Sequence, residues 1–160
     1  GVKKDERWIG VESTAPNQLA EEMVREDRLF SDVTYIKREK TFGKSRFDLY
    51  VEHGGEKHFI EVKGVTLEID GVAKFPDAPT ERGSRHLLEL ISAKEEGFGA
   101  GVMFLIQMDG MKEFSPYDER DPKFGEALRD ANRNGVDIFA YQCIVCEDEL
   151  TLKDEVSIKL

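Results

Sequence analysis

The sequence contains little cysteine, no long apolar run and fewer basic than acidic residues. Two cysteines among 160 residues do not suggest an extracellular disulfide framework and fit a reducing cytoplasm, where we expect the protein to reside. No apolar run approaches the length of a membrane span, and we expect neither a signal peptide nor a membrane partner. Lys and Arg number 23 against 33 Asp and Glu, which makes the formal charge −10. Binding to nucleic acid would therefore need a local basic patch, bound metal ions or a basic partner domain.

The length and composition predict one domain over residues 1–160. A hydrophobic fraction of 39% is enough for a core, and a charged fraction of 35% indicates a well-solvated surface. We find neither repeats nor a low-complexity segment nor a convincing internal linker. The chain starts at Gly1 rather than Met, which we interpret as a processed or truncated start.

Hydrophobic periodicity and turn signals predict an α/β fold in which a mixed sheet is flanked by helices. The expected order is α-β-β-β-α-β-α-β, because antiparallel strands come first and helix-crossover strands follow. The predicted elements are a lead-in at 7–12, a helix of about ten residues from Pro16, a strand at 33–41, a hairpin at 46–64, a turn at 70–71 that extends the sheet, a helix from Thr80 to about Gly97, a buried strand at 101–107, a helix from Asp121 to Asn134, a buried strand at 136–145 and edge strands within 149–160.

Two of the predicted helices have clear apolar stripes. On the first helix, which also carries Glu21 and Glu22, the stripe comprises Leu19, Ala20, Met23 and Val24. On the helix that begins at Thr80, we expect the stripe to comprise Leu87, Leu88, Leu90 and Ile91.

The stretch RFDLYVEHGGEKHFIEVKG, residues 46–64, contains the most informative pattern. Gly-Gly between two alternating runs predicts a hairpin, because both glycines can adopt a positive φ. A symmetric loop places Asp48 opposite Glu61 and Arg46 opposite Lys63, all on one face of the ladder. The opposite face is expected to be the core side and comprises Phe47, Leu49, Val51, Ile60 and Val62.

This charged face has two interpretations. Any half-solvated antiparallel sheet shows a charged outer face, and spacing alone favours that interpretation. However, two carboxylates directly opposite each other repel, and a cation between them would remove the conflict.

Asp48 followed by Glu61-x-Lys63 on the next strand is the spacing of a metal-dependent phosphodiester site. Carboxylates suit Mg²⁺ (or Mn²⁺), which would polarise a phosphate and lower the pKa of a bound water. Lys63 could position that water or offset charge in the transition state. We expect Asp48 and Glu61 as metal ligands, with Glu22 of the first helix as a further site carboxylate and Glu21 as the next choice.

The same pattern resembles the PD-(D/E)xK nuclease superfamily, with its α-β-β-β-α-β core. A longer resemblance covers nearly the whole chain from about Trp8. Four segments carry this resemblance: SRFDLYVE (45–52), FIEVKGVTL (59–67), FPDAPTERGSRHLLEL (75–90) and GVDIFAY (135–141), the last of which follows Asp-Pro at 121–122. These segments are similar to the sugar fermentation stimulation protein A family.

This resemblance implies a nuclease-like domain that is preceded in the family by an OB-fold-like domain associated with DNA binding. That first domain is expected to be absent from this chain, in agreement with its start and its acidic charge. The resemblance also implies DNA as a partner, mainly through the absent domain, and a role in regulating sugar-utilisation genes, notably those for maltose.

Carried over onto this sequence, the family pattern makes Asp48, Glu61 and Lys63 the core of the site and Arg46 a neighbour. It also brings Arg82 and His86 to the start of the following helix, where a helix N-terminus favours phosphate. Ordinary helix capping and burial would equally explain these two residues. Gln107, at the end of a buried strand, is a further candidate.

Two functions remain open from the sequence. The first is a Mg²⁺-dependent nuclease. The second is a non-enzymatic DNA-binding regulator that keeps an inactive nuclease scaffold. The intact set of Asp48, Glu61 and Lys63 favours the first function, whereas the acidic charge and the regulatory description of the family favour the second. The assembly state, including a homodimer, is also left open.

Overall fold

The described part of the chain forms two sheets and the helices that pack on them. The computed structural model describes residues 15–147 and 149–160, and the predicted lead-in at 7–12 lies outside them. The helices are α2 (Ala15–Arg25), α3 (Glu81–Glu95) and α4 (Pro122–Arg133). None of these helices is long and apolar enough to cross a membrane.

The larger sheet has six strands in the order β1-β2-β3-β6-β8-β9. The parallel pairs β3–β6 and β6–β8 form its centre, and antiparallel pairs complete both sides, so the predicted mixed sheet is confirmed. Its strands are β1 (Val33–Phe42), β2 (Ser45–His53), β3 (Glu56–Val65), β6 (Gly99–Ile106), β8 (Asp137–Cys146) and β9 (Glu149–Glu155).

A second sheet replaces the predicted extension of the first. The segment after β3 does form two strands around the turn at Asp70-Gly71, but these belong to a separate four-stranded sheet of order β10-β7-β5-β4. One of its strands, β7, was not predicted, because its four residues end in a proline and show little periodicity. The strands of this sheet are β4 (Leu67–Ile69), β5 (Val72–Phe75), β7 (Glu113–Pro116) and β10 (Ser157–Ile158).

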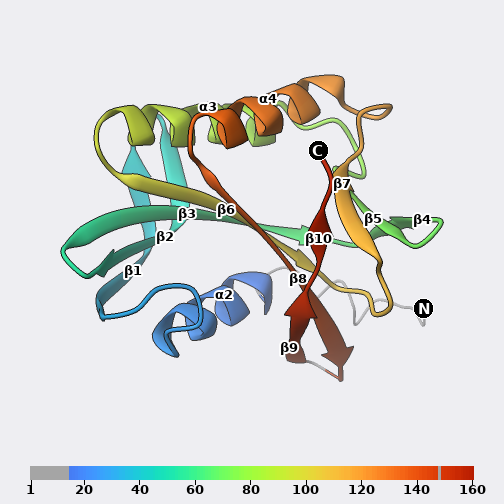
Figure 1. Ribbon diagram of the computed structural model, residues 1–160, viewed down its shortest axis with the longest axis horizontal. Helices are drawn as coiled ribbons and strands as arrows, with labels where there is room; N and C mark the ends of the chain where they lie inside the picture. Colours follow the sequence, from blue (N-terminus) through green and yellow to red (C-terminus); the bar gives the residue numbers. More distant parts are fainter. Residues whose placement is uncertain (1–14, 148) are drawn as a thin grey trace.

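Helices cover both faces of the six-stranded sheet, as Figure 1 shows, with α3 and α4 on one side and α2 on the other. The central strands are therefore buried on both faces, and two separate apolar clusters result. Between α2 and the sheet lies a cluster that includes Leu49, Ile60 and Met103. This explains why β6 is a near-continuous apolar run.

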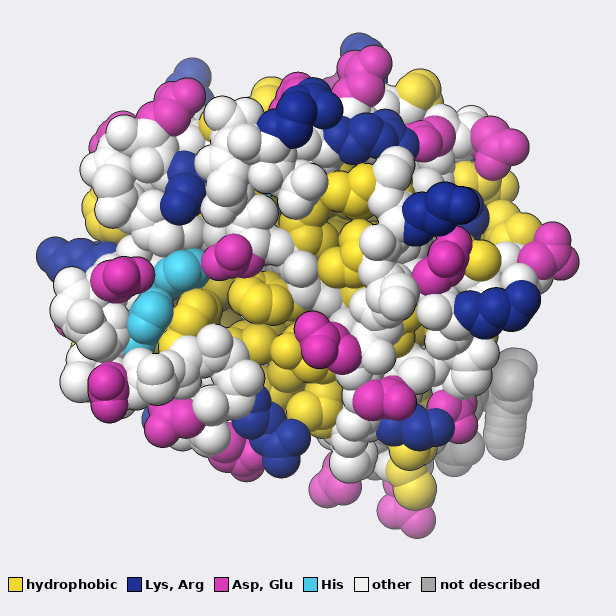
Figure 2. Space-filling model, viewed as in Figure 1, with side chains coloured by type: hydrophobic (Ala, Val, Ile, Leu, Met, Phe, Trp, Pro, Cys, Tyr) yellow, Lys and Arg dark blue, Asp and Glu magenta, His cyan; other side chains and the backbone are white. Residues whose placement is uncertain are grey.

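Acidic and basic side chains are interspersed over the face shown in Figure 2, with no concentration of basic residues on that face. The face also exposes apolar side chains between the charged ones. From the sequence, nucleic-acid binding would need a local basic patch, bound metal ions or a basic partner domain, and this face does not offer the first of these.

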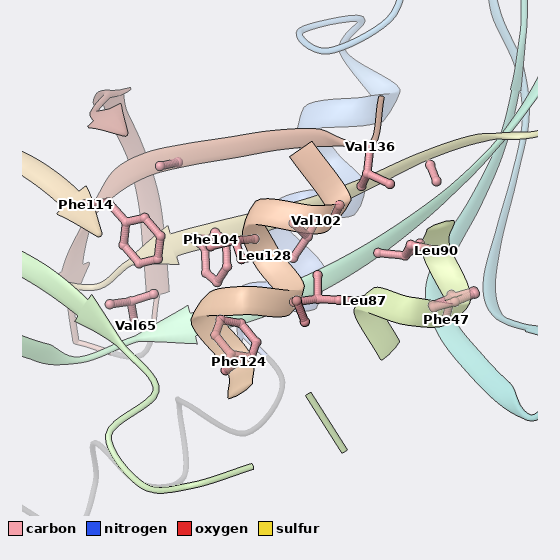
Figure 3. Packing of buried hydrophobic residues seen from close by; sticks show 14 of the residues in the cluster. Phe47, Val65, Leu87, Leu90, Val102, Phe104, Phe114, Phe124, Leu128 and Val136 are labelled. Atoms are coloured by element: carbon pink, nitrogen blue, oxygen red, sulfur yellow. The ribbon is translucent and has the colours of Figure 1, made fainter. Parts of the chain in front are cut away.

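The cluster beneath α3 and α4 is rich in aromatic side chains (Figure 3). Phe104 of β6 stacks on Phe114 of β7, with ring centroids 4.3 Å apart, and meets Phe124 of α4 edge-on at 6.4 Å. This cluster joins the two sheets to α4, because it draws residues from β6, β7 and the helix.

The hairpin forms around Gly54-Gly55 in the expected register, from the pair His53–Glu56 to the pair Leu49–Ile60. The structure does not support the half-solvated, charged outer face that spacing alone favoured, because both faces of the hairpin are covered. Tyr50 and Phe59, which form a pair in the β2–β3 ladder, are buried.

The assignment of Phe47 to the same face as Leu49 was also wrong. Phe47 belongs to the cluster beneath α3, and Leu49 belongs to the cluster beneath α2. Residues two apart on a regular strand share a face. The alternation is therefore interrupted at Asp48, next to the last pair of the β2–β3 ladder.

Both predicted helix starts are confirmed by their caps. The Thr80 hydroxyl accepts a hydrogen bond from Gly83 N at 2.9 Å, and Asp121 Oδ1 accepts one from Phe124 N at 3.2 Å. The predicted stripe of α3 needs one correction. Leu87 is buried, but Leu88 is 52% exposed, because it lies one residue around the helix from the buried side.

Candidate active site

The candidate site is a hollow at the edge of the six-stranded sheet, between the start of α2 and the first turns of α3. The β2–β3 ladder ends there, and β6 delivers its last residues to the same edge. The hollow is lined by Pro16, Asn17, Asp48, Glu61, Val62, Lys63, Gly64, Thr66, Arg82, His86 and Gln107.

Asp48 lies where β2 leaves the ladder, and its carboxylate is partly buried. Asp48 Oδ2 accepts a hydrogen bond from Val62 N at 2.7 Å, and Oδ1 accepts one from Asn17 Nδ2 at 3.3 Å. The predicted side-by-side pairing of Asp48 with Glu61 in the ladder is thus replaced by a bond from the Asp48 side chain to the backbone of β3. This bond fixes the carboxylate beside Glu61.

Asp48 carries a charge that its surroundings do not fully compensate. Burial, followed by the negative charge of Glu61, raises the pKa of Asp48 to about 6 from 3.8. The Val62 N–H and the charge of Lys63 act in the opposite direction and are outweighed. Without a cation, Asp48 is therefore the carboxyl of this pair that takes up a proton as the pH falls.

Glu61 is almost fully buried and has two cationic or donor groups at one of its oxygens. Glu61 Oε2 lies 3.2 Å from Lys63 Nζ and 2.8 Å from His86 Nδ1. Burial alone would raise the pKa of Glu61, but the hydrogen bond with His86 and the charges of Lys63 and His86 hold it below its ordinary value. Glu61 is thus ionised at neutral pH.

Two oxygen atoms lining the hollow are buried and have no hydrogen-bond partner among the residues that the structure describes. They are Glu61 Oε1 and Gln107 Oε1. A buried acceptor without a donor is costly. Because both belong to the lining of one hollow, the site is deficient in positive charge or donors at that place.

Gly64 leaves room for the end of the Gln107 side chain in its present position. A Cβ atom at Gly64 would lie 2.7 Å from Gln107 Nε2 and 3.4 Å from Pro16 Cγ. The sequence indicated Gln107 as a further candidate, and the structure brings it to the hollow.

The first turns of α3 bring His86 and Arg82 to the site. His86 is 3% exposed and contacts the ring of Phe47 edge-on, with centroids 6.1 Å apart. Arg82 is exposed and lines the hollow. Its cationic side chain therefore borders the side on which a ligand can enter.

The structure does not bring three predicted residues to this cluster. Glu22 is exposed and lines a different hollow, between α2 and β9. The alternative, Glu21, pairs with Arg25 and Arg38 on the surface. Arg46 is exposed, and its nearest acidic partner is Glu39 at 3.9 Å.

Asn17 is the residue of α2 that reaches Asp48, and the sequence interpretation had treated it only as part of a helix start. Asn17 lies next to Pro16 in the first turn of α2, which is the end of the helix nearest the hollow. A polar residue in that turn was a signal that could have been given more weight than the glutamates one turn further along.

The donor set fits a hard divalent cation. Asp48 and Glu61 provide carboxylate oxygens, and the unpartnered Oε1 atoms of Glu61 and Gln107 are further oxygen donors. Mg²⁺ and related hard cations prefer such ligands. A cation there would also remove the cause of the raised pKa of Asp48.

A mixed sheet covered by helices on both faces, with Asp48 and Glu61-x-Lys63 on adjacent strands, defines the nuclease-like class of α/β folds. Within that class, the chain belongs to the sugar fermentation stimulation protein family. The family model described as "Sugar fermentation stimulation protein RE domain" matches residues 14–149. The family predicted from the sequence is confirmed.

Relatives cover nearly the whole chain. The sugar fermentation stimulation protein homolog of Clostridium perfringens (strain 13) is 54% identical and matches 98% of this chain and 70% of its own length. The homolog of Clostridium acetobutylicum is 53% identical, over 100% of this chain and 71% of its own length. A solved structure of Pyrococcus furiosus SfsA in complex with Ca²⁺ has a TM-score of 0.84 and 30% identity, and covers 91% of this chain. This chain spans 64% of that Pyrococcus chain.

Proposed function

We propose that this protein is a divalent-cation-dependent phosphodiesterase that acts on DNA. The observation that carries the proposal is the pairing of Asp48 and Glu61 in one hollow, where one carboxyl has a raised pKa and the other has an unpartnered buried oxygen. A purely structural pair of acidic residues would be expected to have its charges and lone pairs satisfied. This pair is better explained as a ligand set for a cation, for which Mg²⁺ or Mn²⁺ is our choice.

Each residue has a proposed role that follows from its position. Asp48 and Glu61 would hold the cation, which supplies Lewis-acid polarisation of the phosphate and an activated water. Lys63, 3.2 Å from Glu61 Oε2, remains close enough to the site to stabilise negative charge that develops on the phosphate. His86 holds Glu61 in place through its contact at 2.8 Å and is therefore a positioning residue.

Arg82 is the proposed contact for a phosphate outside the reacting bond. It lies in the first turn of α3, whose N-terminus favours anions. In an acidic chain, such a local cation matters more than the net charge, because it lines the hollow itself.

The solved relative supports the kind of cation. The Pyrococcus furiosus protein was solved in complex with Ca²⁺, which is also a hard cation that prefers oxygen ligands. Ca²⁺ accepts more ligands and looser geometry than Mg²⁺. We therefore expect Ca²⁺ to bind at this donor set without supporting turnover.

The experiment compares hydrolysis by the unaltered chain, Lys63→Ala and Glu22→Gln. Labelled single- and double-stranded DNA would be used at low salt with Mg²⁺ or Mn²⁺, together with bis(p-nitrophenyl) phosphate. The small diester requires no extended DNA-binding surface, so an acidic chain can be tested on it directly. Glu22→Gln is the control, because Glu22 is an exposed carboxylate away from the hollow.

We expect hydrolysis by the unaltered chain and by Glu22→Gln, and a loss of about 10²–10³-fold in Lys63→Ala, the range for removing one electrostatic stabiliser. Equal rates in all three proteins would refute the proposed role of Lys63. DNA binding without hydrolysis of either substrate would overturn the phosphodiesterase proposal.

That last outcome would favour a second function, a non-enzymatic DNA-binding regulator of sugar utilisation, including maltose genes. The supporting observation is that Lys63 and His86 both already contact Glu61 Oε2 and offset its negative charge. Such contacts are expected in a site that has become structural. The printed name of the family, which refers to stimulation of sugar fermentation, also suits a regulatory protein.

A further inference from the structure

A cluster of nitrogen and oxygen ligands lies at the β2–β3 turn, apart from the candidate active site. His53, Glu56 and His58 each offer a ligand atom, and these atoms lie within 4.8 Å of one another. His53 pairs with Glu56 in the ladder, and His58 pairs with Val51. Because side chains repeat every second residue along a strand, all three point to the same face of the sheet.

The spacing of the two imidazoles fits a tetrahedral metal. His53 Nε2 and His58 Nδ1 are 3.3 Å apart. A tetrahedral Zn²⁺ with nitrogen ligands at about 2.0–2.1 Å holds two such nitrogens about 3.3–3.4 Å apart. The two rings therefore already have the separation that a shared metal requires.

An acidic residue lies next to the outer nitrogen of the His58 imidazole. His58 Nε2, the nitrogen that faces away from His53, lies 3.4 Å from Asp137 Oδ2 at the start of β8. Among the described residues, His58 Nε2 has no other polar partner, and it is buried. A histidine that binds a metal through one nitrogen usually donates a hydrogen bond from its other ring N–H to a carboxylate, a backbone carbonyl or water, which fixes the ring.

The surroundings hold both rings in place. Phe30 stacks on His53 with centroids 4.3 Å apart and contacts His58 at 4.6 Å. On β6, a Cβ atom at Gly99 would overlap the His58 ring at 2.2 Å, so a glycine is required there for the imidazole to lie over β6. The position of His58 thus depends on a residue that leaves room for it.

The cluster is open to solvent on one side. Glu56 is exposed, His53 is half-buried and His58 is buried. Figure 2 shows histidine side chains together at the surface, bordered by acidic side chains, on the side where Figure 1 places the β2–β3 turn. An ion could enter from solvent and keep a fourth position for water.

We propose that His53, Glu56 and His58 form a binding site for a transition-metal ion of the Zn²⁺ type, with Asp137 as the positioning residue for His58. Two imidazoles and one carboxylate favour Zn²⁺ over Mg²⁺, which prefers oxygen ligands only. The site would tie the end of the hairpin together. This inference is independent of the proposed phosphodiesterase activity, because it uses different residues and a different class of ion.

The test is titration of the metal-free 160-residue chain with Co²⁺, followed by displacement with Zn²⁺. The visible absorption of Co²⁺ reports tetrahedral coordination and does not depend on activity. The variants are His53→Gln and Glu56→Gln for the ligands, and Asp137→Asn for the positioning residue. Glu126→Gln removes an exposed carboxylate on α4 as a matched control, and Glu61→Gln removes a ligand of the candidate active site.

We expect one tetrahedral Co²⁺ per chain, displaced by Zn²⁺, in the unaltered protein, Glu126→Gln and Glu61→Gln. Affinity should fall more than about 100-fold in His53→Gln and Glu56→Gln, and about 10-fold in Asp137→Asn, as is typical for loss of a carboxylate behind a metal-bound histidine. Circular dichroism would verify that each variant is folded.

Three results would overturn the proposal. One is an unaltered chain that binds no Co²⁺ in tetrahedral form at millimolar concentration. Another is unchanged affinity in folded His53→Gln and Glu56→Gln. Loss of binding in Glu61→Gln alone would assign the ion to the candidate active site and would equally overturn it.

Discussion

Replacement of Asp48 by Asn is expected to stabilise the metal-free protein at pH 7.5 by about 2 kcal/mol. Burial and the charge of Glu61 raise the pKa of Asp48 from 3.8 to about 6. Two pH units correspond to about 3 kcal/mol of unfavourable free energy when the carboxylate is ionised. Val62 N and Asn17 Nδ2 donate to different oxygens of the Asp48 carboxylate. Asn has only one side-chain oxygen, so one of these two hydrogen bonds is lost, and this loss costs about 1 kcal/mol.

The pH dependence of this effect has a definite sign. The folded state binds the Asp48 proton more tightly than the unfolded state, so the penalty is absent below the unfolded pKa near 3.8 and complete above about pH 6. The stability advantage of Asp48→Asn should therefore shrink as the pH falls from 7.5 towards 4. At the acidic end, only the lost hydrogen bond remains, and the variant becomes the less stable protein.

The assay is thermal or urea unfolding of both proteins with a chelator, at several pH values between 4 and 8. About 2 kcal/mol corresponds to a rise in Tm of roughly 4–8 °C for a chain of this size. Asp77→Asn is the control, because Asp77 is exposed, and its effect should stay within about 0.5 kcal/mol.

Adding Mg²⁺ should reverse the order of stability at pH 7.5. An ion at 100 times its Kd stabilises the protein that binds it by about 2.7 kcal/mol, and we expect this gain only in the unaltered protein. Destabilisation by Asp48→Asn of the same size at pH 5 and pH 7.5 would refute the reasoning, because it would mean that Asp48 carries no uncompensated charge.

Three further predictions concern the site and its support. The apparent affinity for Mg²⁺, measured by calorimetry, should rise about tenfold per pH unit up to about pH 6 and then level off, because the ion competes with the Asp48 proton. An affinity that does not change between about pH 4.5 and 6 would contradict this. In urea unfolding, Leu87→Ala should lower the free energy of unfolding by about 2–5 kcal/mol and Leu88→Ala by less than about 0.5 kcal/mol. The reason is that the Leu87 side chain is buried and the Leu88 side chain is 52% exposed. Equal losses in the two variants would contradict the orientation of α3. Asp121→Ala should lower the free energy of unfolding by about 2 kcal/mol, because it removes the cap of α4 and the acceptor of the hydrogen bond that Thr80 N donates to Asp121 Oδ2 at 2.8 Å. Asp121→Asn, which can keep one of these bonds, should cost less.

Local signals in the sequence were sufficient for much of the fold. The Gly54-Gly55 turn determined the register of β2 and β3, because a two-residue loop leaves only one symmetric pairing. Thr80 and Asp121 marked the starts of α3 and α4, because each side chain caps the helix that follows it. The cluster of Asp48, Glu61 and Lys63 was expected from that register together with the family pattern, although the ladder ends at the pair Leu49–Ile60, one residue before Asp48.

Features that depend on distant contacts were not available from the sequence. The turn at Asp70-Gly71 predicts two strands but not the sheet they join, and here they pair through β7 with a second sheet. The apolar stripe of α2 was predicted correctly, but it does not say which end of the helix meets Asp48. That end carries Asn17, whereas Glu22 lines a different hollow.

The two carboxylates of the candidate site are held by helices from opposite sides of the sheet. Asp48 is bonded to Asn17 of α2, and Glu61 contacts His86 of α3. An ion that bound both carboxylates would therefore connect α2 and α3, the helices on the two faces of the sheet, through residues of the sheet between them. Amide hydrogens in the first turns of both α2 and α3 should then exchange with solvent more slowly when the ion binds, although the two helices lie on opposite faces of the sheet (Figure 1).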